Sequence, residues 1–175
     1  MVIRYSIWIN SLPLDLFKSL VEITGFDINT QDVMHYTPVY YVICSREPKN
    51  NISVSILLHL RSQDGFDVNV KDHDGGSITH WVCCNINTLP IDVVMCLIET
   101  KRVVEINGLD DARNAPIYIA IEQFSSVYGG DVNIKTRLLR QDKLNIDFRD
   151  KNDFTTLYWV CWKIRFVLVD IYLHL

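Results

Sequence analysis

The apolar residues of this chain fall into short runs with helical spacing, and polar turns separate the runs. Two kinds of run alternate along the sequence. One kind predicts helices of about ten residues at 38–44, 78–84, 116–124 and 156–164. The other places apolar residues three and four positions apart, as at Val54, Leu57 and Leu58. The pattern therefore predicts paired helices and an all-α fold.

Two short motifs recur in one register. A tripeptide begins at positions 27, 67, 105 and 145, as Asp-Ile-Asn, Asp-Val-Asn, Glu-Ile-Asn and Asn-Ile-Asp. Ten residues later stand Thr-Pro-Val-Tyr, Ser-Ile-Thr-His, Ala-Pro-Ile-Tyr and Thr-Thr-Leu-Tyr. Both motifs are spaced by 40, 38 and 40 residues, which is typical of a repeat array. We therefore expect a single array over 1–175, with units at 33–72, 73–110 and 111–150 and partial units at 1–32 and 151–175.

In the repeat units, the start of the first helix of the pair carries local signals for helix initiation. Thr37 and Thr155 can cap the helix, because a hydroxyl accepts from the unpaired N–H groups of the first turn. Pro38 and Pro116 suit the first helical position, where the missing N–H costs nothing. The local signals and the repeat register thus predict the same helix boundaries.

This unit resembles the ankyrin repeat. The best matches to the family motifs are Thr-Pro-Val-Tyr at 37–40 and Gly-Phe-Asp-Val-Asn at 65–69, with Asp72 in the following loop. The resemblance implies a solenoid of about four stacked helix pairs with short β-hairpin loops and a concave binding surface. It also implies that the imidazole of His80 bonds to the backbone of a neighbouring loop. Tyrosines replace that histidine in the other units and should weaken this network, at Tyr40, Tyr118 and Tyr158.

The chain departs from the family pattern in three ways. Its period of 38–40 residues is longer than the usual value of about 33. The small alanine expected in the first helix occurs only as Ala120, and valine takes its place in three other units. The loop glycine occurs only as Gly75, and the equivalent positions hold His35, Arg113 and Asp153. These changes predict a divergent array. Divergent arrays of this kind occur in bacterial effectors, protists and large DNA viruses, so a role inside a host cell is one possibility.

Composition and charge narrow the possible functions. The chain has 175 residues, 49% of them hydrophobic, with 17 Lys and Arg against 21 Asp and Glu and a net charge of −4. A net negative charge disfavours nucleic-acid binding. The most apolar segment, 166–175, is far shorter than the twenty or so residues that span a membrane. With no signal peptide evident at the N-terminus, we expect an intracellular, cytoplasmic protein without a membrane span.

The cysteines and histidines offer little chemistry. An odd number of cysteines with an adjacent pair is a poor disulfide framework, so we expect free thiols, with Cys83 and Cys161 buried at matching positions. His80 with Cys83 or Cys84 supplies at most two of the four ligands that zinc needs. The Gly-Gly pair at 129–130 lacks the spacing and the Lys of a phosphate loop. We therefore expect no metal and no cofactor.

The sequence thus predicts a non-enzymatic module that binds a partner protein through loop tips and helix faces. Trp81 and Trp159 are open to two interpretations, as packing residues or as a recognition strip. The predicted partner-binding residues are Lys71, Asp72, His73, Asp74, Trp81, Asp110, Asp111 and Arg113. Two alternatives remain: a targeting segment of a larger enzyme or effector, and a truncated remnant without function. The apolar segment 166–175 has no successor repeat to cover it, so we expect a piece of a longer array that frays or self-associates.

Overall fold

The structure, a computed structural model, describes residues 13–22, 27–44, 51–98, 106–123, 140, 144–145 and 147–163, without the side chains of 51–53 and 96. The described residues form helices α1 (Leu14–Glu22), α2 (Pro38–Ile43), α3 (Asn51–Ser62), α4 (Ile78–Cys84), α5 (Ile91–Ile98) and α6 (Pro116–Glu122). Residues 156–163 are also helical. Every first helix begins at its predicted residue, and the described chain is all-α, as predicted.

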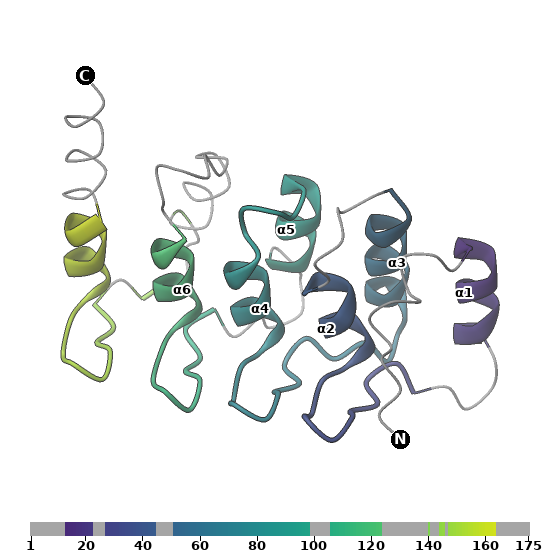
Figure 1. The fold of residues 1–175 in the computed structure, drawn as a ribbon, viewed down its shortest axis with the longest axis horizontal. Coiled ribbons are helices and arrows are strands. Elements are labelled where there is room, and N and C mark those ends of the chain that lie inside the picture. The colour runs from purple at the N-terminus through teal and green to yellow at the C-terminus, as the bar shows by residue number, and fades with distance from the viewer. Residues whose placement is uncertain are drawn as a thin grey trace.

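The helices form two layers (Figure 1). Helices α2, α4, α6 and 156–163 lie side by side in one layer, and their preceding loops project from the same edge of the molecule. Helices α1, α3 and α5 contact one another in sequence and form the second layer. Helix α3 also contacts α2, and α5 contacts α4. In these two units the first helix therefore packs against the second helix that follows it in the sequence.

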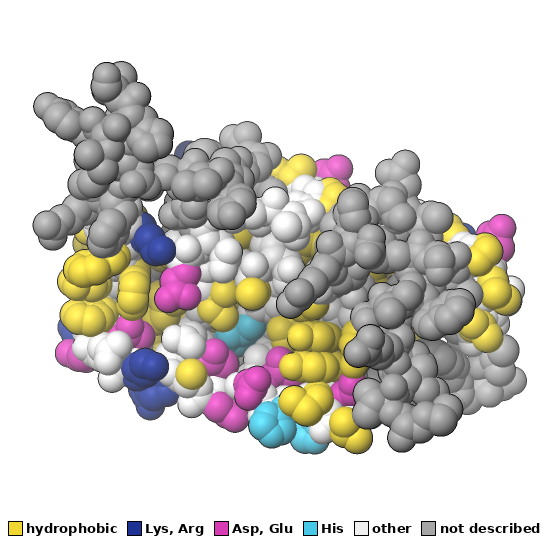
Figure 2. All heavy atoms as spheres, viewed as in Figure 1, with side chains coloured by type: hydrophobic (Ala, Val, Ile, Leu, Met, Phe, Trp, Pro, Cys, Tyr) yellow, Lys and Arg dark blue, Asp and Glu magenta, His cyan; other side chains and the backbone are white. Residues whose placement is uncertain are grey.

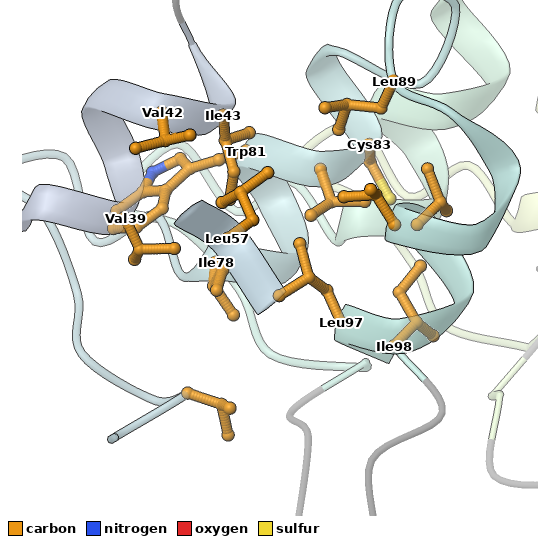
Figure 3. Close-up of a cluster of buried hydrophobic side chains, with 14 of the residues drawn as sticks. Val39, Val42, Ile43, Leu57, Ile78, Trp81, Cys83, Leu89, Leu97 and Ile98 are labelled. Carbon is orange, nitrogen blue, oxygen red and sulfur yellow. The ribbon is translucent and has the colours of Figure 1, made fainter. Parts of the chain in front are cut away.

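The core lies between these layers (Figure 3). Val42 and Val82, which stand where the resemblance expects alanine, are fully buried. The indole of Trp81 packs beside Val39 and Val42 of the neighbouring helix α2. Burying one large apolar side chain contributes roughly 1.5–3 kcal/mol. The structure thus places Trp81 in the packing between two units.

The predicted helix caps are confirmed. The Thr37 hydroxyl oxygen accepts from the N–H of Tyr40 at 3.4 Å, and the Thr155 oxygen accepts from the N–H of Tyr158 at 3.3 Å. Pro38 and Pro116 occupy the first turn of their helices. These contacts satisfy N–H groups that the helix itself leaves unpaired, and therefore define where each first helix begins.

The loops before the first helices are tight turns. The expected β-hairpins are reduced, among the described residues, to isolated bridges between Lys71 and Ser77 and between Arg149 and Thr155. Each loop has one residue with positive φ at the position of the loop glycine, namely Gly75 at 74° and its replacements His35 at 58°, Arg113 at 63° and Asp153 at 67°. The loop backbone therefore repeats even where its glycine is lost.

The structure corrects one expectation about the thiols. Cys83 is fully buried, as predicted, but Cys161 is exposed. Helix α4 packs against both α5 and α6, which enclose Cys83. Among the described residues, no second helix packs against 156–163, where Cys161 is exposed. The Gly-Gly pair at 129–130 and the segment 166–175 lie outside the described residues.

Candidate functional site

Each loop is built around an aspartate at one register position, namely Asp32, Asp72, Asp110 and Asp150. One carboxylate oxygen, Oδ1, accepts from the backbone N–H four residues later. The distances from that oxygen are 2.9 Å to Tyr36, 2.7 Å to Gly76, 2.7 Å to Asn114 and 3.0 Å to Phe154. In three of the loops it also accepts from the N–H two residues later, in Met34, Asp74 and Asn152. These carboxylates therefore hold the loops closed.

The second oxygen of the loop aspartate joins the loop to its helix. The indole N–H of Trp81 donates to Oδ2 of Asp72 at 2.7 Å, and that of Trp159 donates to Asp150 at 2.9 Å. The hydroxyl of Tyr41 donates to Asp32 in the same way. In the remaining loop Ile119 stands at the aromatic position, and the side-chain amide of Asn114 donates to Asp110 instead. Sequence reasoning missed this pair, although an aspartate followed nine residues later by an aromatic residue was its signal.

Hydrogen bonding alters the acidity of two of these aspartates. Burial alone would raise the pKa of Asp32, but the Tyr41 hydroxyl and two backbone N–H groups lower it below the usual value. Burial would likewise raise the pKa of Asp150, but backbone N–H groups and the Trp159 indole lower it below the usual value. Both groups are therefore charged at neutral pH, and the charge strengthens the hydrogen bonds that close each loop.

Neighbouring loops are tied to one another through the backbone. The N–H of His73 donates to the carbonyl of Met34 at 3.1 Å, and the N–H of Asp111 donates to the carbonyl of Asp74 at 2.9 Å. The side-chain amide of Gln31 adds a bond of 2.8 Å to the carbonyl of Lys71. The tips of the first three loops thus form a connected edge, and hydrogen bonds set their spacing.

The repeated tripeptide makes a second set of ties. Asn29 donates to the carbonyl of Gly65 at 2.7 Å and accepts from the N–H of Asp67 at 3.0 Å. Asn107 accepts in the same manner from the N–H of Asn145 at 2.8 Å. The asparagine of this motif therefore bonds to the following unit, which gives the recurring tripeptide a physical role.

His80 links its own helix to the next loop, as the resemblance implies. The N–H of Ser77 donates to Nδ1 of His80 at 3.1 Å, and Nε2 lies 3.1 Å from the carbonyl of Asn114. Because Nδ1 accepts, the proton resides on Nε2, and the neutral ring donates to Asn114. Burial lowers the pKa of His80, which also favours the neutral form. At the equivalent position the Tyr118 hydroxyl donates to the carbonyl of Phe148, so that substitution retains a bond between units.

The structure divides the predicted partner-binding residues into two groups. Trp81 is only 5% exposed, and the carboxylates of Asp72 and Asp110 are occupied inside their loops. The exposed remainder, here named the loop rim, consists of Lys71, His73, Asp74, Asp111 and Arg113. Acidic and histidine side chains gather along this edge of the molecule (Figure 2).

The loop rim carries charges of both signs. Lys71 and Arg113 stand beside Asp74 and Asp111, so the exposed set is less acidic than the loop sequences suggest. Nδ1 of His73 lies 3.3 Å from Oδ1 of Asp74, and both side chains are largely exposed. An exposed pair of this kind contributes little to stability. Both side chains can therefore contact a binding partner at little cost in stability.

The possible metal ligands among the described residues are not clustered. Within this part of the chain no three His, Cys, Asp or Glu side chains are placed to hold a metal ion. Cys44, Cys83, Cys84 and Cys161 form no disulfide bond, and burial raises the pKa of Cys83 and of Cys84. A raised thiol pKa lowers the fraction of reactive thiolate.

No protein-family model matches this chain, and no curated protein matches it significantly. None of the described helices has both the length and the apolar character needed to cross a membrane. The interpretation of the site therefore rests on the geometry of the loops and helices.

Proposed function

We propose that this chain is a non-enzymatic protein–protein interaction module, built as an ankyrin-like solenoid that binds a partner through its loop rim. The observation that carries the proposal is the shared loop geometry. Four loops, spaced by 40, 38 and 40 residues, combine the same internal aspartate bonds with one positive-φ residue. In a scaffold that is held from within, exposed side chains at the loop tips can contact a partner without loss of the loop structure.

The rim suits a protein partner with charged side chains of its own. The exposed positions carry both acidic and basic residues over two neighbouring loops. Such a pattern selects a partner by charge complementarity and affects the association rate more than the affinity. We therefore expect binding to weaken as the salt concentration rises.

Charge reversal on the rim tests the proposal. The variant D74K/D111K changes two exposed rim carboxylates whose removal leaves the loop bonds of Asp72 and Asp110 in place. The control D15K/D92K makes the same change of net charge at exposed residues in the first turns of α1 and α5. We expect proteins captured by the immobilised chain to be lost with the rim variant and retained with the control. Equal capture by both variants would refute a role for the rim.

A further inference from the structure

One of the recurring tripeptides ends in an Asn-Gly sequence. Asn107 precedes Gly108, and no other glycine of the chain follows an asparagine. At the same position of the tripeptide stand Asn29 and Asn69, which precede a threonine and a valine. A glycine has no Cβ to obstruct the approach of its backbone nitrogen to the side chain of the preceding residue. Asn107 therefore combines the position of a repeated structural asparagine with a chemical neighbour that the other two lack.

The side chain of Asn107 holds two successive tripeptides together. Its Oδ1 accepts from the backbone N–H of Asn145 at 2.8 Å, just as Oδ1 of Asn29 accepts from the N–H of Asp67. Asn107 is half-buried and Gly108 is buried. A change of the Asn107 rotamer would break the bond to Asn145. Chemistry that needs such a change therefore depends on opening of this contact, here named the Asn107–Asn145 link.

We propose that Asn107 is a site of spontaneous covalent modification, whose side-chain amide becomes a carboxylate when the Asn107–Asn145 link opens. The backbone nitrogen of Gly108 loses its proton to solvent base and attacks Cγ of Asn107. A cyclic succinimide forms, and the side-chain nitrogen takes up a proton and leaves as ammonia. Water then adds to one ring carbonyl and breaks its bond to the ring nitrogen, which is protonated again. The net change is the loss of ammonia and the gain of water, with no oxidant or reductant.

The two carbonyls of the ring give two products. Attack of water at Cγ gives aspartate, which keeps an oxygen acceptor for the N–H of Asn145. The next tripeptide already carries an aspartate, Asp147, at the same position. Attack at the main-chain carbonyl gives isoaspartate, which adds a methylene to the main chain and moves the carboxylate. We therefore expect the isoaspartate product to leave the Asn107–Asn145 link permanently weakened.

Opening of the link controls the rate. The reaction proceeds from the open form, so the native rate equals the rate in the unfolded chain multiplied by the open fraction. Each tenfold slowing in the native chain corresponds to about 1.4 kcal/mol of opening free energy. The hydroxyl of Tyr118 holds the same segment three residues beyond Asn145, since it donates to the carbonyl of Phe148. Removal of that hydroxyl should therefore raise the open fraction. None of these residues belongs to the loop rim, so this inference is independent of the proposed function.

Peptide mapping by mass spectrometry tests the proposal on the full chain at mildly alkaline pH. In guanidinium chloride, Asn107 should exchange ammonia for water at least about tenfold faster than Asn29 and Asn69, because only Asn107 precedes a glycine. In native buffer Asn107 should still convert, but at least about tenfold more slowly than in denaturant. The isolated isoaspartate form should exchange the amide hydrogens of 156–163 faster than the unmodified chain.

A matched pair of variants tests the control by opening. Y118F removes the hydroxyl bond to Phe148 and should raise the native rate at Asn107 at least about threefold, without changing the rate in denaturant. Y40F makes the same change at the equivalent position of α2 and should leave both rates unchanged. The comparison of native buffer with denaturant uses the unaltered chain, so the test holds even if a variant fails to fold.

Four results would each overturn the proposal. They are the absence of conversion in the native chain, a native rate equal to the rate in denaturant, a rate at Asn107 no higher than at the other two asparagines, and equal acceleration by Y118F and Y40F.

Discussion

His80 is the described residue whose protonation most directly affects contact between units. Its Nδ1 accepts from Ser77 and its Nε2 donates to Asn114, so both nitrogens are engaged in the neutral form. A second proton on Nδ1 would face an N–H donor. Burial lowers the pKa of His80 from its ordinary value of 6.5, so the unfolded chain takes up the proton more readily than the folded chain.

We therefore expect the free energy of unfolding to fall as the pH drops below about 6.5, and to level off below the folded-state pKa of His80. Urea unfolding at pH 7.5 and pH 5.5 measures this change. The variant H80Q should be less stable at both pH values by roughly 1–3 kcal/mol, because it cannot satisfy both partners. It should also lose the pH dependence in this window. An equal acid loss in H80Q would assign the effect to another group.

The left-handed loop position gives a second test at the scale of single residues. Gly75 has φ of 74°, and a Cβ there would lie 2.5 Å from Oδ1 of Asp111. Arg113 adopts a similar φ of 63° with a side chain, at a cost of about 1–2 kcal/mol. G75A should therefore lower the midpoint of thermal unfolding.

The reverse kind of substitution, which introduces a glycine at position 113, should have the opposite effect on the midpoint of thermal unfolding. R113G should raise that midpoint slightly, since relief of strain outweighs the entropy that glycine adds to the unfolded chain. In the G75A background, D111A removes the clashing oxygen and should recover part of the loss. If G75A proves neutral, the close approach of the two loops does not hold in solution.

At the scale of elements, the bond between loop aspartate and helix aromatic fixes each loop to its helix. Asp72 accepts two backbone N–H groups and the indole N–H of Trp81. W81F keeps most of the ring and removes the indole donor, and should destabilise by roughly 1.5–3 kcal/mol because the lost bond involves a charged group. A double-mutant cycle of D72N and W81F, measured by urea unfolding, should give a coupling energy of about 1 kcal/mol or more. Additive effects would mean that the two residues act independently.

The helices could be predicted because their signals are local. Thr37, Pro38 and the apolar spacing define the first helix of a unit without reference to distant residues. The loop position with positive φ was also readable, because Gly75 identifies it and the repeat register transfers it to Arg113. The bond from Asp72 to Trp81 was not predicted, since a spacing of nine residues has no meaning until the loop geometry is known.

The burial of individual residues depends on the whole molecule and was predicted less well. Cys83 and Cys161 occupy matching positions in the repeat, yet one is buried and the other exposed. Equivalence in sequence implies equivalence in environment only where the neighbouring units are equivalent as well. Trp81 illustrates the same point. It is buried because it packs against α2, and the local sequence pattern does not reveal that this helix is its neighbour.

The number of helices that pack against each helix also predicts which part of the molecule unfolds locally with the lowest free energy. Helix α4 packs against α2, α5 and α6, whereas 156–163 has one described neighbouring helix in its layer, α6 (Figure 1). In a stack of units, local opening requires the least free energy where the fewest contacts are lost. Hydrogen exchange of the dilute monomer should therefore protect the amides of α4 at least about tenfold more than those of 156–163, a difference of about 1.4 kcal/mol.

The two helices differ in the burial of equivalent side chains. Thr79 and Cys83 of α4 are buried, whereas Leu157 and Cys161 of 156–163 are exposed. Opening of 156–163 therefore uncovers less apolar surface than opening of α4, and less surface newly exposed to water means a smaller free energy of opening. Equal protection of the two helices would contradict this prediction, because the number of packed neighbours would then not determine where the molecule opens.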